Sequence, residues 1–124
     1  YGVVDVEVDR ALQYLEEVRK KTGKHITLTH MVGKAIAEAI RRNPDCNSIL
    51  RWGKIYRRKT IDVFYLVAVD KDGKDLSGTL VRDADQKTLL QIAEHLEEKA
   101  AAIRSGKDKS FAQMTGLVGK LPGW

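Results

Sequence analysis

The pattern of apolar and polar positions predicts an alternation of strands and helices along the chain. Apolar residues recur every three or four positions over residues 10–22, 28–42 and 86–104, which is the period of an amphipathic helix. Valines alternate with acidic residues over residues 3–9, which is typical of a half-buried strand. The clearest helical stripe consists of Leu28, Met31, Val32, Ala35, Ile36, Ala39 and Ile40. Its two alanines leave room for a closely packed neighbour.

The predicted helix ends carry residue types that start or stop helices. Asp9 and Asp85 can each accept a hydrogen bond from the free backbone N–H groups at a helix start. Either Thr27 or Thr29 can do the same for the second helix. Gly23 suits the left-handed conformation that often follows a helix.

Two antiparallel hairpins are expected between the second and third helices. Nearly every residue from 61 to 69 is apolar on both alternating faces, which predicts a strand covered on both sides. The polar stretch 70–75 contains an Asp-Gly turn signal, and residues 76–81 return as the partner strand. A shorter hairpin is expected to turn around Gly53, within residues 47–56.

Composition indicates one small folded domain with an ordinary charged surface. The chain has 124 residues, of which 43% are hydrophobic and 31% charged, with a formal net charge of +5. Seventeen carboxylates dilute the basic residues, which argues against nucleic acid as a partner. One segment, Trp52, Tyr56, Arg57 and Arg58, does mix aromatic and basic groups as single-strand binding surfaces do. We favour instead a hairpin whose aromatic faces the core and whose cations face water.

The single cysteine and the distribution of charge bear on the location of the protein. Cys46 cannot form an internal disulfide, which fits a reducing, cytoplasmic location, and we expect it to be partly buried. Acidic residues within the first ten positions interrupt any signal-peptide pattern, and no apolar run reaches the roughly 18 residues of a membrane span. Both ends of the sequence resemble cuts in something longer.

Candidate chemical groups do not assemble into a recognisable catalytic or metal-binding pattern. His25, His30 and His95 lie far apart and lack the spacing of metal ligands, so no metal is predicted. Asp83 and Asp85 could form a carboxylate pair, but a role at the start of a helix explains both more simply. Arg82, which precedes them, could form an ion pair with either acid.

Five ordered segments carry a family resemblance. Residues 27–42 follow the helix pattern T-x-x-x-x-(V/I)-(G/I)-K-A-(I/L)-A, and residues 43–48 follow (F/N)-P-x-x-N-(A/S). Residues 61–70 are similar to a strand ending in A-V-D, and residues 97–107 to a charged helix ending in R-x-G-K. Residues 81–89, VRDADQKTL, match (I/V)-R-(D/N)-A-D-x-(K/L)-(S/T)-L. Together they resemble the catalytic domain of dihydrolipoyl acyltransferases, the acyltransferase components of 2-oxo acid dehydrogenase complexes.

The resemblance, which runs from Val4 to Phe111, implies a fold and a substrate class. The implied fold is α/β (α+β), a mixed β-sheet flanked by helices like that of chloramphenicol acetyltransferase, here incomplete. Such domains form homo-oligomers, namely trimers with active sites between subunits. Coenzyme A or lipoamide carries the acyl group, and no cofactor is bound covalently. Residues 1–110 are then the N-terminal part of an acyltransferase-like domain, and residues 111–124 an apolar tail that starts a further segment.

Departures from the family pattern leave no catalytic residue in the chain. The family's general base lies in an H-x-x-x-D-G motif, which follows none of the three histidines. The family's hydroxyl-bearing T-(F/I)-(T/S)-(I/V)-S/T-N strand is also missing. Arg82, Asp83 and Asp85 are therefore assigned as a structural motif, and the substrate-binding residues stay open. The alternative is a non-catalytic assembly or regulatory module on the same framework. Only the tail offers a route to membrane association.

Overall fold

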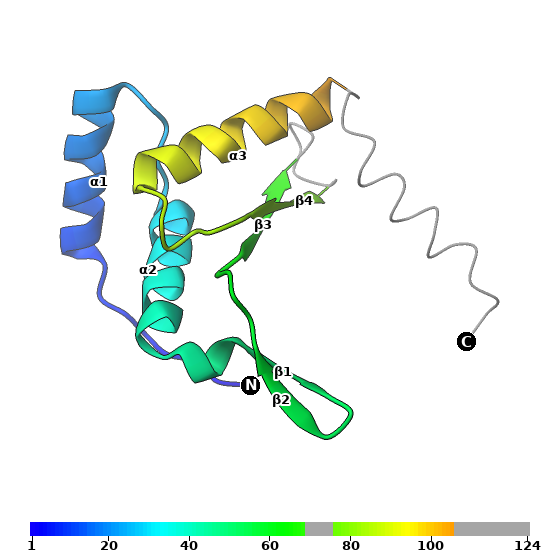
Figure 1. Cartoon of the computed structure of the whole chain (residues 1–124). Helices are drawn as coiled ribbons and strands as arrows, with labels where there is room; N and C mark the ends of the chain where they lie inside the picture. The colour runs from blue at the N-terminus through cyan, green and yellow to red at the C-terminus, as the bar shows by residue number, and fades with distance from the viewer. Residues whose placement is uncertain (69–75, 106–124) are drawn as a thin grey trace.

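A computed structural model describes residues 1–68 and 76–105, and it confirms the three predicted helices and the two predicted hairpins between the second and third of them (Figure 1). The predicted turn at 70–75 and the tail at 111–124 lie outside the described residues. The elements, in chain order, are α1 (Asp9–Thr22), α2 (Leu28–Arg42), the 3₁₀ helix η1 (Pro44–Asn47), β1 (Ser48–Arg51), β2 (Lys54–Arg57), β3 (Val63–Ala68), β4 (Leu76–Val81) and α3 (Leu89–Arg104).

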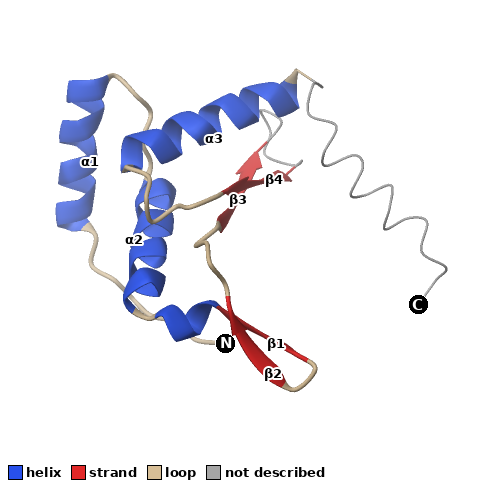
Figure 2. Cartoon of the chain, in the orientation of Figure 1, coloured by secondary structure: helices blue, strands red, loops and turns tan. Residues whose placement is uncertain are grey.

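The strands form two separate antiparallel hairpins, as the two-stranded pairs in Figure 2 show. In the larger hairpin β3 pairs with β4, with Val63 opposite Val81 and Val67 opposite Ser77. Helices α2 and α3 pack against this hairpin, and α1 lies beside α2. In the smaller hairpin β1 pairs with β2, and this hairpin projects away from the helices (Figure 1).

The core lies where α3 meets the other elements, and its apolar stripe is buried as predicted. One buried cluster joins α2, β3, β4 and α3, and a second joins α1, the segment before α2, and α3. Ile92 and Leu96 of α3 contribute to the first cluster, and Ala93 contributes to the second. The other fully buried members are Leu15, Ile26, Ala37, Val81 and Ala84. Helix α3 therefore contributes to both buried clusters and connects them.

The β3–β4 hairpin is covered on one face only, which corrects the prediction of burial on both faces. Tyr65 points toward the helices and is 4% exposed, whereas Phe64 and Leu66 on the other face are 56% and 65% exposed. The physical reason is that both helices that contact the hairpin pack on the same side, so the described residues supply no second layer.

Helix α2 is also turned differently from the prediction. Its buried residues are Gly33 and Ala37, whereas Val32 and Ile36 of the predicted stripe are about half exposed. The expected close contact is made by glycine rather than by the alanines, because the ring of Tyr65 occupies the space beside Gly33. The strongest apolar stripe of the sequence is therefore left partly uncovered by the described residues.

The predicted strand at the start of the chain is wrong. Residues 1–8 form no strand, since no neighbouring strand in the described part of the chain offers them backbone hydrogen bonds. Asp9 is the first residue of α1 rather than its cap, which is Val8. Its charge still lies in the first turn, where the helix dipole favours an acid. The predicted end at Gly23 is confirmed, with φ of +66°.

Helices α2 and α3 begin with the same reciprocal capping arrangement. In α3 the Thr88 hydroxyl accepts from the Gln91 N–H at 3.2 Å, and the Gln91 side chain accepts from the Thr88 N–H at 2.9 Å. In α2 the cap is Thr27, whose N–H donates to Nδ1 of His30 at 3.1 Å. A histidine thus fills the position that glutamate or glutamine usually takes in a capping box.

The β1–β2 turn forms at the predicted place but exposes its aromatic residue. Trp52 and Gly53 form the two-residue turn, with φ of +52° and +71°. Trp52 is 98% exposed and Tyr56 about half exposed, so the prediction that an aromatic of this hairpin faces the core is wrong. The hairpin projects beyond the helices (Figure 1), and every residue from 50 to 57 is exposed.

A glycine on β4 accommodates an aromatic ring from β3. The ring of Phe64 lies against Gly78, where an added Cβ would overlap it. The two residues are diagonal neighbours across the hairpin, since Phe64 pairs with Leu80 and Gly78 with Leu66.

Candidate functional site

The turn after β4, residues 82–86, contains the Arg-Asp-Ala-Asp motif and is tied to the segment before β3. Asp83 has a left-handed backbone with φ of +50°, and its N–H donates to Oδ1 of Asp62 at 3.1 Å. The N–H of Ala84 donates to the carbonyl of Ile61 at 2.8 Å, and the Ala84 side chain is fully buried. The backbone of this motif, rather than its side chains, makes these contacts.

A lysine on α2 completes the link between this turn and the helices. Nζ of Lys34 donates to the carbonyl oxygen of Asp85 at 2.7 Å and to that of Ala84 at 3.4 Å. Lys34 is half-buried, so these carbonyls replace part of the water that its charge would otherwise need. Sequence reasoning missed this residue. The available signal was that Lys34 is the single charged residue within the otherwise apolar stretch from Met31 to Ala37.

The side chains of the motif do not take the predicted roles. Arg82 is exposed and forms no ion pair with Asp83 or Asp85 within the described ranges 1–68 and 76–105. Asp85 does not cap α3, because the chain turns through residues 82–86 first and the cap is Thr88. The Asp85 carboxylate instead accepts from the Gln86 side chain at 2.6 Å.

A recess of about 520 Å³ lies between the start of α2, strand β3 and helix α3. Its walls are apolar and come mainly from β3 and α3, whereas its polar groups come from the start of α2 and the end of α3. The apolar lining residues are Tyr65, Leu66, Val67, Ala68, Ala93, Leu96 and Ala100, and the polar ones are His25, Thr27, Thr29, His30, Glu97 and Arg104.

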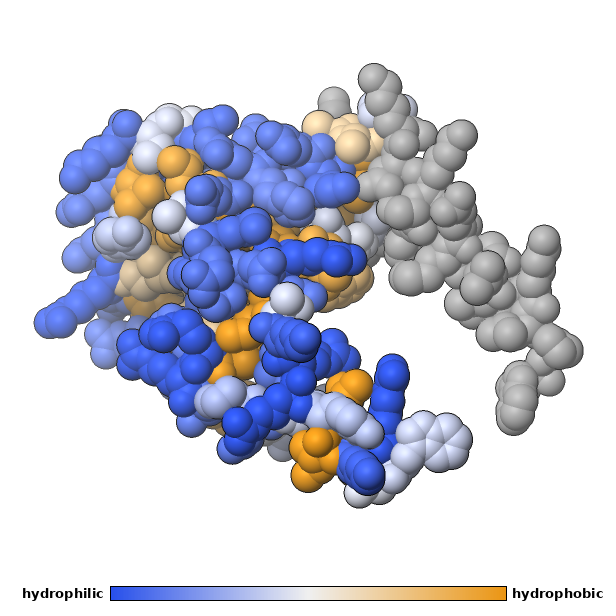
Figure 3. All heavy atoms as spheres, viewed as in Figure 1, coloured by the Kyte–Doolittle hydropathy of each residue, from blue (hydrophilic) through white to orange (hydrophobic). Residues whose placement is uncertain are grey.

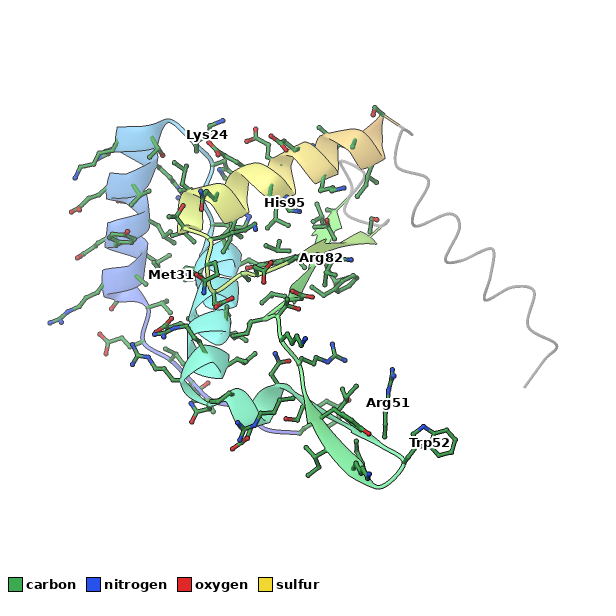
Figure 4. All side chains as sticks on the ribbon, viewed as in Figure 1. Lys24, Met31, Arg51, Trp52, Arg82 and His95 are labelled. Carbon is green, nitrogen blue, oxygen red and sulfur yellow. The ribbon has the colours of Figure 1, made fainter. Side chains whose placement is uncertain are left out.

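The structure brings two of the three histidines to this recess, which sequence reasoning did not predict. His25 and His30 line it, whereas His95 lies on another face of α3 (Figure 4). Burial, and secondarily the charge of His25, lowers the pKa of His30 below its ordinary value of 6.5. Nδ1 of His30 accepts from Thr27, so the neutral ring carries its proton on Nε2. His30 therefore offers the recess a hydrogen-bond donor and no basic nitrogen.

The Tyr65 hydroxyl is a second hydrogen-bond donor at the recess, in addition to Nε2–H of His30. This hydroxyl is buried and has no hydrogen-bond partner in the part of the chain that the structure describes. Burial raises the pKa of the Tyr65 phenol, so the group stays protonated at neutral pH. His30 and Tyr65 can donate hydrogen bonds, but neither is placed to remove a proton from a substrate.

The described residues do not assemble a metal site or a membrane span. Residues 1–68 and 76–105 contain no group of three or more histidine, cysteine, aspartate or glutamate side chains that could hold a metal ion. No helix within these ranges is long and apolar enough to cross a membrane. Cys46 is exposed, which corrects the expectation of partial burial, because η1 lies at the base of the projecting hairpin.

Comparison with known proteins identifies the family. The model of the 2-oxoacid dehydrogenases acyltransferase (catalytic domain) matches residues 1–118. The chain is 29% identical to the lipoamide acyltransferase component of the branched-chain alpha-keto acid dehydrogenase complex of Bacillus subtilis (strain 168). That match covers 86% of this chain and 26% of its relative, so the chain spans about a quarter of that protein.

Solved structures give the same answer for the fold. A probable dihydrolipoamide acetyltransferase from Listeria monocytogenes is similar with a TM-score of 0.74 and 27% identity, over 86% of this chain and 46% of that one. The cubic core of the pyruvate dehydrogenase multienzyme complex is similar with a TM-score of 0.64 and 32% identity, over 81% and 41%. These likenesses confirm the predicted α/β class. The chain belongs to the family of 2-oxoacid dehydrogenase acyltransferases and matches their catalytic domain.

Proposed function

We propose that this chain forms part of a domain that transfers an acyl group between coenzyme A and lipoamide or a similar thiol. The observation that carries the proposal is the family match over residues 1–118, which spans every element described above. The Bacillus subtilis relative is named as a lipoamide acyltransferase component, which supports lipoamide as the acceptor. Coenzyme A as the acyl carrier rests on the resemblance of the sequence to the family.

The catalytic base of this reaction comes, in our proposal, from protein outside this sequence. None of the three histidines is followed by the family's x-x-x-D-G pattern. The neutral His30 ring has no free basic nitrogen, because Nδ1 accepts from the Thr27 N–H. Arg82, Asp83 and Asp85 contribute framework, since the backbone of their turn joins the segment before β3 to helix α2.

Uncovered apolar surface supports the proposal that this chain works with further protein. An isolated two-stranded sheet is only marginally stable in water, and the outer face of β3–β4 exposes Phe64 and Leu66. We infer that residues 1–110 form the N-terminal part of the domain and that residues 111–124 lead into a further segment. The likeness to a multienzyme core supports homo-oligomers, and we propose trimers. A reducing, cytoplasmic location is proposed from the single cysteine.

The test is a thiol-release assay with acetyl-CoA and dihydrolipoamide. We expect no turnover from this chain alone, and turnover when it is co-expressed with the part of the Bacillus subtilis catalytic domain that it does not match. A triple variant, His25→Ala, His30→Ala and His95→Ala, serves as the control for the missing base. Turnover by this chain alone that persists in the triple variant would overturn the proposal, as would a co-expressed pair that assembles and stays inactive.

A second candidate, a non-catalytic assembly module, is favoured by one observation on α2. Val32 and Ile36 leave an apolar stripe about half exposed, on a helix whose other side is packed against the core. Such a stripe suits contact with another helix. In sedimentation experiments Val32→Ser/Ile36→Ser should then abolish association with an acyltransferase trimer. A wild-type chain that sediments as a monomer and does not bind such trimers would exclude this role.

A further inference from the structure

The projecting β1–β2 hairpin carries a concentrated positive charge. Residues 46–61 contain five basic side chains and no acidic one. These five charges equal the formal net charge of +5 for the whole chain, so the remaining residues balance to zero. Within the part of the chain that the structure describes, Arg57 is the one of the five that forms an ion pair, with Asp45 at 2.5 Å. Figure 4 shows Arg51 and Trp52 at the tip of this hairpin, with the Trp52 ring extending outward beyond the turn.

The same hairpin exposes large apolar side chains. Leu50 and Ile55 are direct partners across the two strands and are 72% and 75% exposed. Trp52 extends from the tip and is almost fully exposed. Figure 3 shows hydrophobic side chains uncovered on the projecting hairpin, between basic ones. Folding of the described residues therefore gains little from burying these groups.

The turn itself is made with an unfavourable residue. Both central positions have positive φ, +52° at Trp52 and +71° at Gly53, as in the type I′ turn of a two-residue hairpin. Asparagine, aspartate and glycine adopt this conformation readily, whereas a bulky side chain there is an outlier. Neither the turn geometry nor core packing explains a tryptophan at this position. Strained, exposed residues of this kind are typical of binding sites.

We propose that the β1–β2 hairpin is a docking arm for a protein surface that has an apolar pocket surrounded by carboxylates. Trp52 and the Leu50–Ile55 pair enter the pocket, and Arg51 and Lys54, which pair across the strands, meet the carboxylates. Tryptophan and arginine are the residues most often found to dominate the energy of protein interfaces. The cations also speed the encounter with an acidic partner and exclude basic ones.

The aliphatic pair distinguishes a protein partner from a nucleic acid. Single-stranded nucleic acid binds by stacking bases on aromatic rings and by pairing phosphates with cations. Trp52 and Arg51 would suit both partners. Leu50 and Ile55 would stay in water on a nucleic acid, whereas an apolar protein pocket would bury them.

The test measures fluorescence anisotropy of three labelled probes of equal charge at 150 mM salt. They are a polyglutamate peptide, a glutamate-rich peptide with interspersed leucine and phenylalanine, and an oligo-dT. We expect the mixed peptide to bind at least tenfold more tightly than polyglutamate. Leu50→Ser/Ile55→Ser should remove this advantage and leave polyglutamate binding unchanged. Arg51→Gln/Lys54→Gln should weaken both peptides.

A charge-matched variant on α1 controls for loss of positive charge elsewhere on the surface. Lys20→Gln/Lys21→Gln removes two exposed charges from α1 and should leave binding unchanged. Circular dichroism checks that each variant is folded, and all four hairpin positions are exposed. Tighter binding of oligo-dT than of either peptide would replace the proposal with nucleic-acid binding. The proposal also fails if no probe binds, or if the α1 variant weakens binding as much as the hairpin variant does.

Discussion

The Tyr65 ring of β3 lies so close to Gly33 of α2 that a single added methyl group on the helix would overlap it. An ideal Cβ at Gly33 would collide with the hydroxyl oxygen and with the adjoining ring carbons. Gly33 is buried and has an ordinary helical backbone, so glycine is needed here for space and not for an unusual φ. This contact sets how closely α2 approaches the β3–β4 hairpin.

We expect Gly33→Ala to destabilise the fold by about 2 kcal/mol. Helix propensity alone favours alanine by about 1 kcal/mol, and overpacking a core costs typically about 1–3 kcal/mol. Because Tyr65 is itself buried, its ring has little room to move, and the overpacking term should dominate. Urea unfolding would measure the change.

Two variants show whether Tyr65 causes the loss. In a Tyr65→Val background, Gly33→Ala should become neutral or stabilising, since the colliding ring is gone. Gly2→Ala, which meets nothing within 4 Å, should change stability little. Equal losses from Gly33→Ala with and without the ring would refute the explanation.

Lys34→Met should lower the free energy of unfolding by about 1–2 kcal/mol. Hydrogen bonds to charged groups contribute about 1.5–3 kcal/mol, and the hydrogen bond from Lys34 to the Asp85 carbonyl is only partly buried. The substitution keeps most of the apolar stem and removes the donor to the carbonyls of Ala84 and Asp85. Lys20→Met on the exposed face of α1 is the matched control, with an expected change within about 0.5 kcal/mol. Similar urea midpoints for the two variants would show that the link is unimportant.

Stability should fall as pH decreases below about 6.5, through His30. Its pKa is lower in the folded chain than in the unfolded one, so the unfolded state takes up the proton first. The contribution of neutral His30 to the free energy of unfolding is therefore fully present above the unfolded-state pKa of 6.5. It is lost progressively as the pH falls toward the lower pKa of the folded state. Protonation also removes the acceptor at Nδ1 that the Thr27 N–H uses.

His30→Gln should abolish this pH dependence and keep the helix cap, as Gln91 does in α3. His25→Gln should retain most of the slope, since burial and not His25 is the larger cause of the shift. Thermal unfolding between pH 7.5 and 5.5 would compare the three proteins. A slope that survives in His30→Gln would point to another titrating group.

Trp52→Asn should stabilise the β1–β2 hairpin by about 1 kcal/mol, because asparagine tolerates the left-handed backbone that costs other residues about 1–2 kcal/mol. Amide hydrogen exchange in β1 and β2 would report the gain as slower exchange. Trp52→Ala removes the same side chain without relieving the backbone and should give no gain. If the two variants exchange alike, backbone strain at this turn is absent.

Hydrophobic period located the helices and both hairpins, because that period follows directly from helix and strand geometry. It could not show which face each element buries. The period on α2 predicts a stripe through Val32 and Ile36, but the helix buries Gly33 and Ala37, because the Tyr65 ring packs against Gly33. The apolar run from 61 to 69 predicts a strand covered on both faces, whereas the described residues cover only one face.

The site was less predictable because it depends on contacts between distant residues. The Arg-Asp-Ala-Asp motif marked the family, but its side-chain roles at a helix start were wrong for Asp85. Its actual partner, Lys34, lies 51 residues earlier, and no local pattern connects the two. His25 and His30 likewise meet the recess only because α2 and α3 enclose it.

The contact of Phe64 with Gly78 also determines how β3 and β4 align. A slip of two residues would keep the same faces buried, so burial alone cannot exclude it. Such a slip would move the Phe64 ring from the one outward position on β4 without a side chain to a position that has one. Gly78 therefore favours the observed alignment of β3 and β4 over an alignment shifted by two residues. A larger residue at position 78 would be expected to give a folded population with mixed strand alignment, visible as doubled amide resonances in β3 and β4.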